Sequence, residues 1–266
     1  MTTHSYQHIR FTLEPNGLAY LTLNRPEQAN AFNAQMITEL LDAMDFLATQ
    51  PSARGLMLSG EGKHFCAGAD IDWMRSMADK DHSSNLTDAY QLATLMHTLD
   101  TLPLPTLALV QGSAFGGALG LICCCDMAIA SDDARFCLSE VKLGLVPATI
   151  APYVIRAMGN RQARRYMLSA EMINASSALS LGLVHHIASA PAAKNEAQQW
   201  LENVAQHGPE ALRMTKALCQ HCDHHMINES LIQYTSDLIA QVRVSAQGQE
   251  GLNAFLDKRA PNWQST

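Results

Sequence analysis

The chain has 266 residues, of which 47% are hydrophobic and 16% charged, and its formal net charge is −7 at pH 7. This composition is typical of a folded globular protein and excludes an intrinsically disordered chain. The acidic balance lacks the positive field that attracts nucleic acid or an anionic membrane, so neither is expected as a partner. At about 100 to 200 residues per domain, the length allows one large domain or two small ones.

The cysteines and the first residues indicate the compartment. There are seven cysteines, and Cys123, Cys124 and Cys125 are consecutive, which does not fit a framework of disulfides. A reducing compartment is therefore expected. Residues 1–10 are polar, and the sequence contains no continuous apolar run of membrane-spanning length, so neither a signal peptide nor a membrane span is predicted. The cytoplasm is the expected location.

The first half of the chain alternates between strand and helix patterns. Apolar runs at 8–13 and 18–23 flank Pro15-Asn16-Gly17, which predicts a β-hairpin. Residues 33–49 carry apolar side chains at spacings of three and four, which predicts a helix with Asn33 as its N-cap. Further strands are predicted at 55–59, 106–110 and 127–130, and further helices at 87–102 and from Gly116 onward. Such alternation predicts crossover connections and stacked layers.

The last third of the chain has a different pattern. After Pro147 the strand signals fade, and helices are predicted at 161–168, 175–181, 193–205, 209–219 and 227–242. No internal repeat or flexible linker separates the two parts. The expected organisation is a core over residues 1–190, followed by a helical C-terminal region over residues 191–266.

Two glycine-bearing turns, at 64–71 and 112–118, follow predicted strands. Amides at such turns and at helix N-termini are unpaired, so they can receive an anion or an oxygen that becomes anionic. Turns that only pack a helix closely against a strand have the same pattern. The dinucleotide-binding fingerprint G-x-G-x-x-G does not follow the first strand. Taken alone, the two turns leave both interpretations open.

Five segments, in order, resemble the crotonase (enoyl-CoA hydratase/isomerase) superfamily over nearly the whole chain. Residues 23–32 are similar to the family's LNRP…NA segment, residues 65–71 to F-x-A-G-A-D-I, and residues 112–126 to G-x-A-x-G-G-G…D. Residues 136–147 are similar to F-x-x-P/S-E-x-x-x-G-x-x-P, and residues 250–263 to EG-x-x-AF-x-x-KR-x-P-x-W/F. The resemblance implies an α/β crotonase (ClpP/crotonase-like) fold, a spiral of repeated β-β-α units with an α-helical C-terminal region.

The resemblance also implies a catalytic site. It assigns the backbone N–H groups of Ala69 and Gly117 to an oxyanion hole for the thioester oxygen of an acyl-CoA. Preorganised donors of this kind stabilise the charge that accumulates on the oxygen in an enolate. Glu140 matches the family carboxylate that moves a proton to or from the α-carbon, a role that typically contributes about 10²- to 10⁴-fold. Taken alone, Glu140 could equally be a solvated surface residue.

Coenzyme A is part of the substrate in this family, so no separate cofactor is expected. The resemblance implies a set of substrate contacts, namely Glu27, Gln28, Ala29, Ala31, Ala67, Gly68, Asp70, Ile71, Gly116 and Gly120. The backbone around the first four would hold the adenine together with Ala67, Ala69 and Ile71. Lys258, from a C-terminal helix, is a candidate phosphate contact. A basic residue near the chain end can equally be a plain solvated charge.

Gly120 departs from the family pattern. Hydratases with two carboxylates carry a second glutamate at this point, where it helps to hold the attacking water. Three interpretations stay open: a hydratase in which Glu140 handles both water and proton, helped by a polar group of the substrate; a Δ3,Δ2-enoyl-CoA isomerase; and a non-catalytic acyl-CoA-binding protein. Other chemistries of the superfamily, such as decarboxylation or thioester hydrolysis, are less expected.

The surroundings of Gly120 favour the hydratase. The glycine itself and the run PATIAP at residues 147–152 resemble bacterial hydratases of glutaconyl-CoA-type substrates in leucine and acyclic-terpene breakdown. We therefore expect 3-methylglutaconyl-CoA or isohexenylglutaconyl-CoA as the substrate.

The helical C-terminal region raises two further expectations. In the family such helices pack between the protomers of a trimer, so a homotrimer or a dimer of trimers is expected.

Cysteine and histidine side chains cluster at residues 219–225. They follow a helical pattern and lack a distant second pair of ligands, so no metal site is expected.

Overall fold

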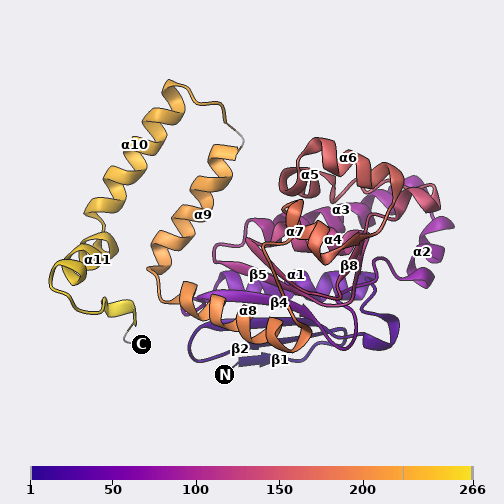
Figure 1. Ribbon diagram of the computed structural model, residues 1–266, viewed down its shortest axis with the longest axis horizontal. Helices are drawn as coiled ribbons and strands as arrows, with labels where there is room; N and C mark the ends of the chain where they lie inside the picture. The colour runs from indigo at the N-terminus through magenta and orange to yellow at the C-terminus, as the bar shows by residue number, and fades with distance from the viewer. Residues whose placement is uncertain (1, 224, 265–266) are drawn as a thin grey trace.

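The computed structural model describes residues 2–223 and 225–264. Its central feature is a seven-stranded sheet (Figure 1). In spatial order the strands are β1 (Thr2–His4), β2 (Ile9–Leu13), β3 (Leu18–Leu23), β4 (Gly55–Gly60), β5 (Thr106–Val110), β7 (Met127–Ser131) and β10 (His186–Ala188). The first three strands pair antiparallel and the others join in parallel. The predicted hairpin and the α/β fold class are confirmed.

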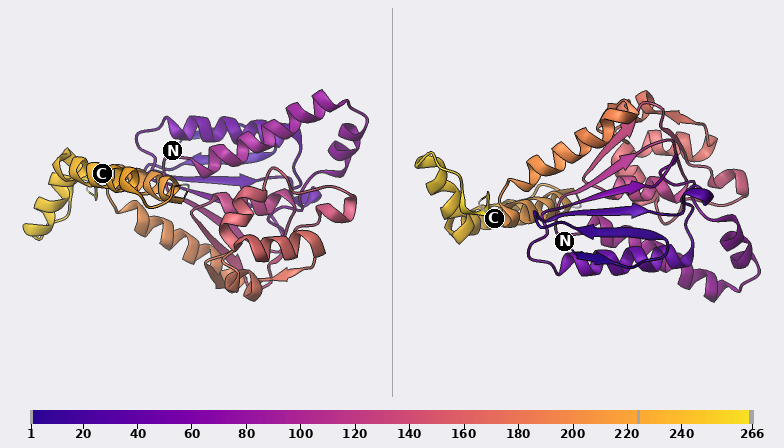
Figure 2. Two further views of the ribbon diagram at one scale, coloured as in Figure 1. Left: turned by 90° about the horizontal axis from the view of Figure 1, so that it is seen from above. Right: turned by 90° about the horizontal axis from the view of Figure 1, so that it is seen from below.

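Both faces of this sheet are covered, which explains the continuous apolar runs of its strands. Leu56 and Leu58 of β4 point into the larger core with α1 (Ala34–Ala48) and α3 (His82–Asp100). Met57 points to the other face, where α8 (Ala190–Ala205) packs. Figure 2 shows α1 and α8 on opposite sides of the strands. The alternation follows from the period of two along a strand.

A second, three-stranded sheet carries the segments that lead to the predicted site. It consists of β6 (Ser113–Phe115), β8 (Arg135–Cys137) and β9 (Ile173–Asn174). These strands are too short to show a clear alternation, and the sequence predicted none of them. The same is true of β1 and β10.

The helices agree with the predictions in most places. Asn33 caps α1 by accepting a hydrogen bond from the Met36 amide at 2.9 Å, as predicted. The helix expected from Gly116 is α4 (Gly117–Cys124), and those expected at 161–168 and 175–181 are α6 (Asn160–Ser169) and α7 (Ala175–Ser180). Two further helices were not predicted in this part of the chain, α2 (Ile71–Ala78) and α5 (Ala151–Met158).

The C-terminal helices are α9 (Pro209–Asp223), α10 (Glu229–Val244) and α11 (Ala246–Leu256). Figure 1 shows α10 and α11 standing away from the sheet, with α9 between them and the rest of the chain. Helix α9 is tied to the core by Lys216, whose Nζ lies 2.9 Å from Oδ2 of Asp126. Helix α8 was expected in the C-terminal region, but it packs on the sheet through Ala193, Ala197 and Leu201.

All seven cysteines are free thiols. Burial raises the pKa of Cys123 to about 12 and also raises the pKa values of Cys124 and Cys125, so these three stay protonated at neutral pH. No helix in the described part of the chain is both long and apolar enough to cross a membrane.

Candidate active site

The two glycine-bearing turns lie side by side. The Cys66 amide donates to the carbonyl of Ser113 at 3.1 Å, and the Phe115 amide donates to the carbonyl of Cys66 at 3.0 Å. Gly68 has φ of 95°, and a Cβ there would lie 3.0 Å from the Phe115 oxygen and 4.0 Å from the Gly116 nitrogen. Only glycine allows this approach. It brings together the residues that immediately precede Ala69 and Gly117.

The amides of Ala69 and Gly117 are both unpaired. Within residues 2–223 and 225–264, neither N–H group donates a hydrogen bond to another backbone group. Gly117 is the first residue of α4, so its N–H lies at the positive end of the helix dipole. Adjacent turns therefore present two free donors, as an oxyanion hole requires.

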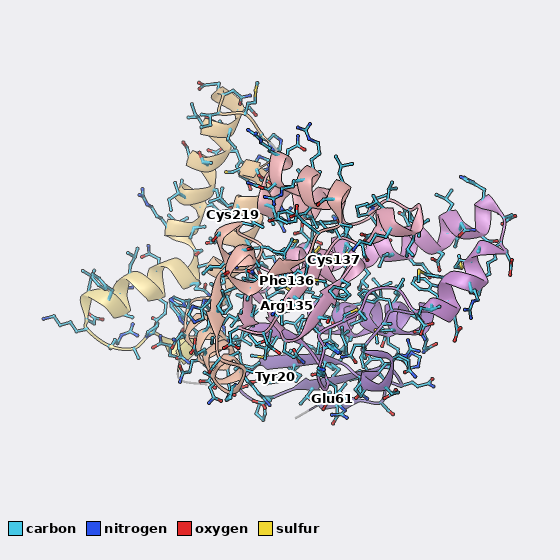
Figure 3. All side chains as sticks on the ribbon, turned by 45° about the vertical axis from the view of Figure 1, so that its right-hand side comes forward. Tyr20, Glu61, Arg135, Phe136, Cys137 and Cys219 are labelled. Atoms are coloured by element: carbon cyan, nitrogen blue, oxygen red, sulfur yellow. The ribbon has the colours of Figure 1, made fainter. Side chains whose placement is uncertain are left out.

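Glu140 lies beside these donors. It begins the 3₁₀ helix η2 (Glu140–Leu143), which follows β8, and the β8 residue Cys137 accepts a hydrogen bond from the Gly116 amide at 2.9 Å. A Cβ on Gly116 would lie 3.2 Å from Oε1 of Glu140. Figure 3 shows Phe136 and Cys137, which lead into this segment, near the middle of the molecule.

The surroundings of Glu140 favour proton exchange. Its Oε2 atom is buried and has no hydrogen-bond partner among the described residues. Burial raises the pKa of Glu140 and outweighs the opposing hydrogen bond from its own backbone. A carboxyl group with a raised pKa and an unpartnered oxygen, next to two free donors, is suited to take up and release a proton.

Gly120, an expected substrate contact, is closely packed in the core. A Cβ on Gly120 would overlap Cγ2 of Ile150 and lie 2.8 Å from Sδ of Met96. All three residues are buried. The glycine therefore serves close packing of α4 against α3 and the segment before α5, and the space of a side chain at position 120 is filled by apolar atoms.

The two segments expected to hold coenzyme A are neighbours. Glu27 and Gln28 are exposed in the 3₁₀ helix η1 (Pro26–Gln28), and Ala29 follows with φ of 49°. The Ala67 amide donates to the Ala29 carbonyl at 2.9 Å. Phe32, just after Ala31, pairs with Ala69 in a parallel bridge. The expected residues at 27–31 and 67–71 thus form one continuous surface beside the two free amides, where Ile71 is 67% exposed.

Arg25 and Asn30 hold this surface together, a role that the sequence analysis missed. Arg25 donates from Nη1 to the Ala31 carbonyl at 2.7 Å and from Nη2 to Oδ2 of Asp70 at 2.9 Å. Asn30 is fully buried and donates to the carbonyls of Glu61 and His64. Both residues lie in the LNRP…NA segment on which the family resemblance rests, and this resemblance was the signal that could have indicated their role.

Asp70 is engaged within the protein. Its Oδ1 accepts hydrogen bonds from the amides of Asp72 and Trp73 and so caps α2. Burial favours a higher pKa for Asp70, but the Trp73 amide and Arg25 outweigh it and hold the pKa below its usual value. Asp70 therefore stays ionised and fixes the turn that carries Ala69.

Lys258 is not brought to this site within one chain. It follows α11, and Figure 1 shows α11 at the opposite end of the molecule from α2, the helix that begins just after Ala69. Gly116, in contrast, lies at the centre of the site between Gly68 and Glu140.

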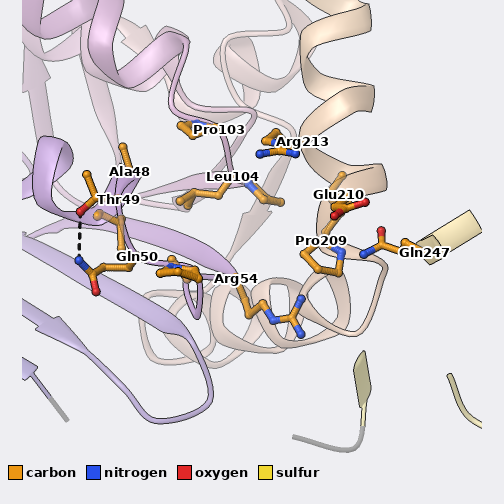
Figure 4. Close-up of a pocket in the computed structure, with 15 residues that line it drawn as sticks. Ala48, Thr49, Gln50, Arg54, Pro103, Leu104, Pro209, Glu210, Arg213 and Gln247 are labelled. Carbon is orange, nitrogen blue, oxygen red and sulfur yellow. Dashed lines mark hydrogen bonds between the residues drawn. The ribbon is translucent and has the colours of Figure 1, made fainter. Parts of the chain in front are cut away.

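A cleft of about 430 Å³ lies between the end of α1, residues 103–105 and the start of α9 (Figure 4). It contains none of the predicted site residues.

Over the described ranges, no three His, Cys, Asp or Glu side chains are grouped to hold a metal ion. Of the cluster at 219–225, His224 lies outside the described residues, and the ring of His221 stacks on His225 and Tyr234.

Comparisons with known proteins show the family of the chain. The sequence profile of the family described as Enoyl-CoA hydratase/isomerase matches residues 14–266. The 2,3-dehydroadipyl-CoA hydratase of Escherichia coli is 32% identical over 92% of this chain and 94% of the relative. The crystal structure of an enoyl-CoA hydratase from Shewanella pealeana has 46% sequence identity and a TM-score of 0.94, covering 97% of this chain and 96% of that one.

AtuE of Pseudomonas aeruginosa has 35% identity and a TM-score of 0.93, with 97% of this chain and 100% of AtuE covered. The expected crotonase fold is therefore confirmed. The chain belongs to the enoyl-CoA hydratase/isomerase family and is an enzyme of the enoyl-CoA hydratase type.

Proposed function

We propose that the enzyme adds water across the 2,3 double bond of a branched acyl-CoA of the 3-methylglutaconyl type, with Glu140 as the only protein carboxylate at the reacting carbons. The observation that carries this proposal is the packing at Gly120, where Ile150 and Met96 fill the space of a second carboxylate.

In the proposed reaction the thioester oxygen accepts hydrogen bonds from the amides of Ala69 and Gly117. Glu140 removes a proton from water while the water oxygen attacks C3, and the electrons of the double bond move onto the thioester oxygen. The resulting enolate then takes the proton from Glu140 at C2. Loss of one such donor costs about 2.7 to 4 kcal/mol in a well-studied enzyme, which indicates how much two preorganised amides can supply.

A polar group on the substrate would compensate for the missing second carboxylate. The surroundings of Gly120 are apolar, so the protein offers no replacement there. The name of the Escherichia coli relative describes an acyl group that ends in a second carboxyl group. A glutaconyl-type acyl group has the same feature, and its carboxylate could help to hold the attacking water.

The proposal includes the binding of coenzyme A on the surface formed by residues 27–31 and 67–71. Lys258 would contact phosphate only from a neighbouring protomer, since it lies away from the site of its own chain. We also propose a homotrimer or a dimer of trimers, because apolar side chains on α10 and α11 are exposed in the single chain, with Phe255 82% and Leu256 73% exposed. Light scattering of the purified protein tests the assembly.

A Δ3,Δ2-enoyl-CoA isomerase is the second candidate, and the same observation favours it. One carboxylate is sufficient to carry a proton from one carbon to another. Glu140, with its raised pKa, would remove the proton from C2 and return it at C4.

A panel of three thioesters separates these functions. Crotonyl-CoA, 3-hexenoyl-CoA and 3-methylglutaconyl-CoA are each offered to the enzyme, and the products are analysed for added water and for the position of the double bond. Preferred hydration of 3-methylglutaconyl-CoA supports the proposal. Migration without hydration supports the isomerase, and tight binding without turnover of any ester overturns both. Glu140→Ala is the control, expected to bind the esters and to lose at least about 10²-fold in turnover.

A further inference from the structure

The two amides of the proposed oxyanion hole are linked by one buried side chain, and this inference rests on the proposed function. Phe32 lies immediately before α1 and is 1% exposed. Its neighbour Asn33 caps α1, which anchors this point of the chain to a helix of 15 residues. Phe32 contacts both turns, through its backbone on one side and through its ring on the other.

The backbone of Phe32 orients the Ala69 amide. Its N–H donates to the carbonyl of Gly68 at 2.7 Å, and its carbonyl accepts from the Asp70 amide at 2.8 Å. The peptide between Gly68 and Ala69 is planar and trans, so its N–H points away from its carbonyl. Because Phe32 holds that carbonyl, the Ala69 N–H is directed to the opposite side.

The ring of Phe32 supports Gly117. A Cβ on Gly117 would lie 3.3 Å from Cε2 and 3.6 Å from Cδ2 of Phe32. Apart from chain neighbours and its own helix, no other described atom lies within 4 Å of that position. The ring is therefore the surface against which the first residue of α4 rests.

We infer that Phe32 is the positioning residue that sets the separation and direction of the two oxyanion-hole amides. It does not contact the reacting atoms. A smaller side chain leaves the Phe32 backbone bonds in place but removes the support under Gly117, so one donor shifts relative to the other. Displacement by about 1 Å at a catalytic site can cost about 10²-fold in rate.

Phe32→Leu tests the inference, with Phe11→Leu as the matched control. Phe11 is also 1% exposed in the same core, but it lies in β2 and its ring makes a T-shaped contact with the ring of Phe46. We expect both variants to lose similar stability, which thermal unfolding measures. A purely structural role predicts similar kinetic effects for the two, whereas a positioning role predicts a difference.

The first readout is the rate of hydration under the proposed function. We expect Phe32→Leu to lower kcat by about 10- to 100-fold with a smaller change in KM, and Phe11→Leu to change kcat less than about twofold. Equal kcat values for the two variants would overturn the inference. If Phe32→Leu does not fold, Phe32→Met replaces it, since methionine keeps more of the volume.

The second readout does not depend on turnover. Butyryl-CoA has no double bond to hydrate, and the infrared stretch of its carbon-13-labelled thioester carbonyl reports hydrogen bonding at the oxygen. Binding to the wild type and to Phe11→Leu should lower this frequency, and Phe32→Leu should return it toward its value in water. If the frequency in Phe32→Leu equals that in the wild type, the inference is overturned but the proposed oxyanion hole is not. Absence of any shift in the wild type overturns the proposed oxyanion hole and the inference with it.

Discussion

Gly120 and Ile150 are in such close contact that no side chain fits between them. A Cβ on Gly120 would overlap Cγ2 of Ile150 and would lie 2.8 Å from the sulfur of Met96. Atoms of Ile150 and Met96 therefore occupy the space that a second carboxylate at position 120 would need.

Gly120→Ala tests this close packing, because the packing determines whether the substitution raises or lowers the free energy of unfolding. Alanine in place of glycine within an exposed helix stabilises by roughly 0.5–1 kcal/mol. At Gly120 we expect the opposite, a loss of about 1–3 kcal/mol, because the extra methyl group overpacks the core. Urea unfolding measures the change.

A double-mutant cycle with Ile150→Ala isolates the contact behind that loss. The double variant should lose less stability than the sum of the two single variants, because the shortened side chain at position 150 makes room for the methyl group. A stabilising Gly120→Ala, or simple additivity, contradicts the packing described.

Gly116→Ala should affect catalysis more than its strain alone explains. Gly116 has φ of 54°, and a Cβ there would lie 3.2 Å from Oε1 of Glu140. The methyl group would displace the carboxylate, so we expect kcat to fall by at least about tenfold. Gly159→Ala is the control, because Gly159 has φ of 76° with nothing within 4 Å. It should lose stability while keeping its kcat, and a similar fall in both would contradict the role of the contact.

The local patterns of the sequence predicted most of the fold but not its shortest parts. Asn33 and the apolar spacing after it defined α1, because capping and a helical stripe are local properties. Strands such as β9, with two residues, carry no period of their own and form only because β8 is available to pair with them. Helix α2 was missed for a similar reason: none of its residues is buried, so no apolar stripe marks it.

The candidate site could be predicted from the sequence only in part. The glycine turns indicated where free amides can occur, and their meeting required the strand pairing between Cys66 and Ala114. The role of Arg25 depends on Asp70, which lies 45 residues further along the chain. Contacts over such separations leave no periodic signal. The contact of Ile150 with Gly120 could not be predicted for the same reason, because the two residues are also far apart in the sequence.

Glu140→Gln should stabilise the protein at neutral pH. Burial raises the pKa of Glu140, so the folded state retains a proton that the unfolded chain releases. Stability therefore falls as the pH rises from the ordinary glutamate value through the raised one. Glutamine removes this penalty. The melting temperature of the variant should exceed that of the wild type at pH 7 and approach it below about pH 4. No pH dependence of the difference would contradict the raised pKa.

The pH dependence of catalysis should report the same group. Glu140 must be ionised to remove a proton, so kcat/KM should fall on the acidic side of a pKa above the ordinary glutamate value of 4.5. Initial rates across pH 4 to 8, with stability checked at each pH, give this value. An acidic limb at or below the ordinary value would indicate that Glu140 is solvated or is not the base.

Arg25→Gln should weaken the binding of coenzyme A esters by loosening the loop at 27–31. The side chains of Arg25 and Asp70 are each 13% exposed, and Arg25 also donates to the Ala31 carbonyl. Removing one partner leaves buried groups unsatisfied, which costs about 1–3 kcal/mol. We expect a lower melting temperature and a raised KM, measured by thermal unfolding and by initial rates.

Arg75→Gln provides the matched control for Arg25→Gln, because it breaks an ion pair within α2 whose acidic partner, Asp72, lies two residues after Asp70. Arg75 and Asp72 are 78% and 90% exposed, and such pairs contribute about 0–1 kcal/mol. The control should therefore leave the melting temperature and KM nearly unchanged. If both variants behaved alike, the charge of the segment would matter and the clamp formed by Arg25 would not. A large effect of Arg25→Gln, with none of Arg75→Gln, would show that the contacts of Arg25 keep the coenzyme A surface in place.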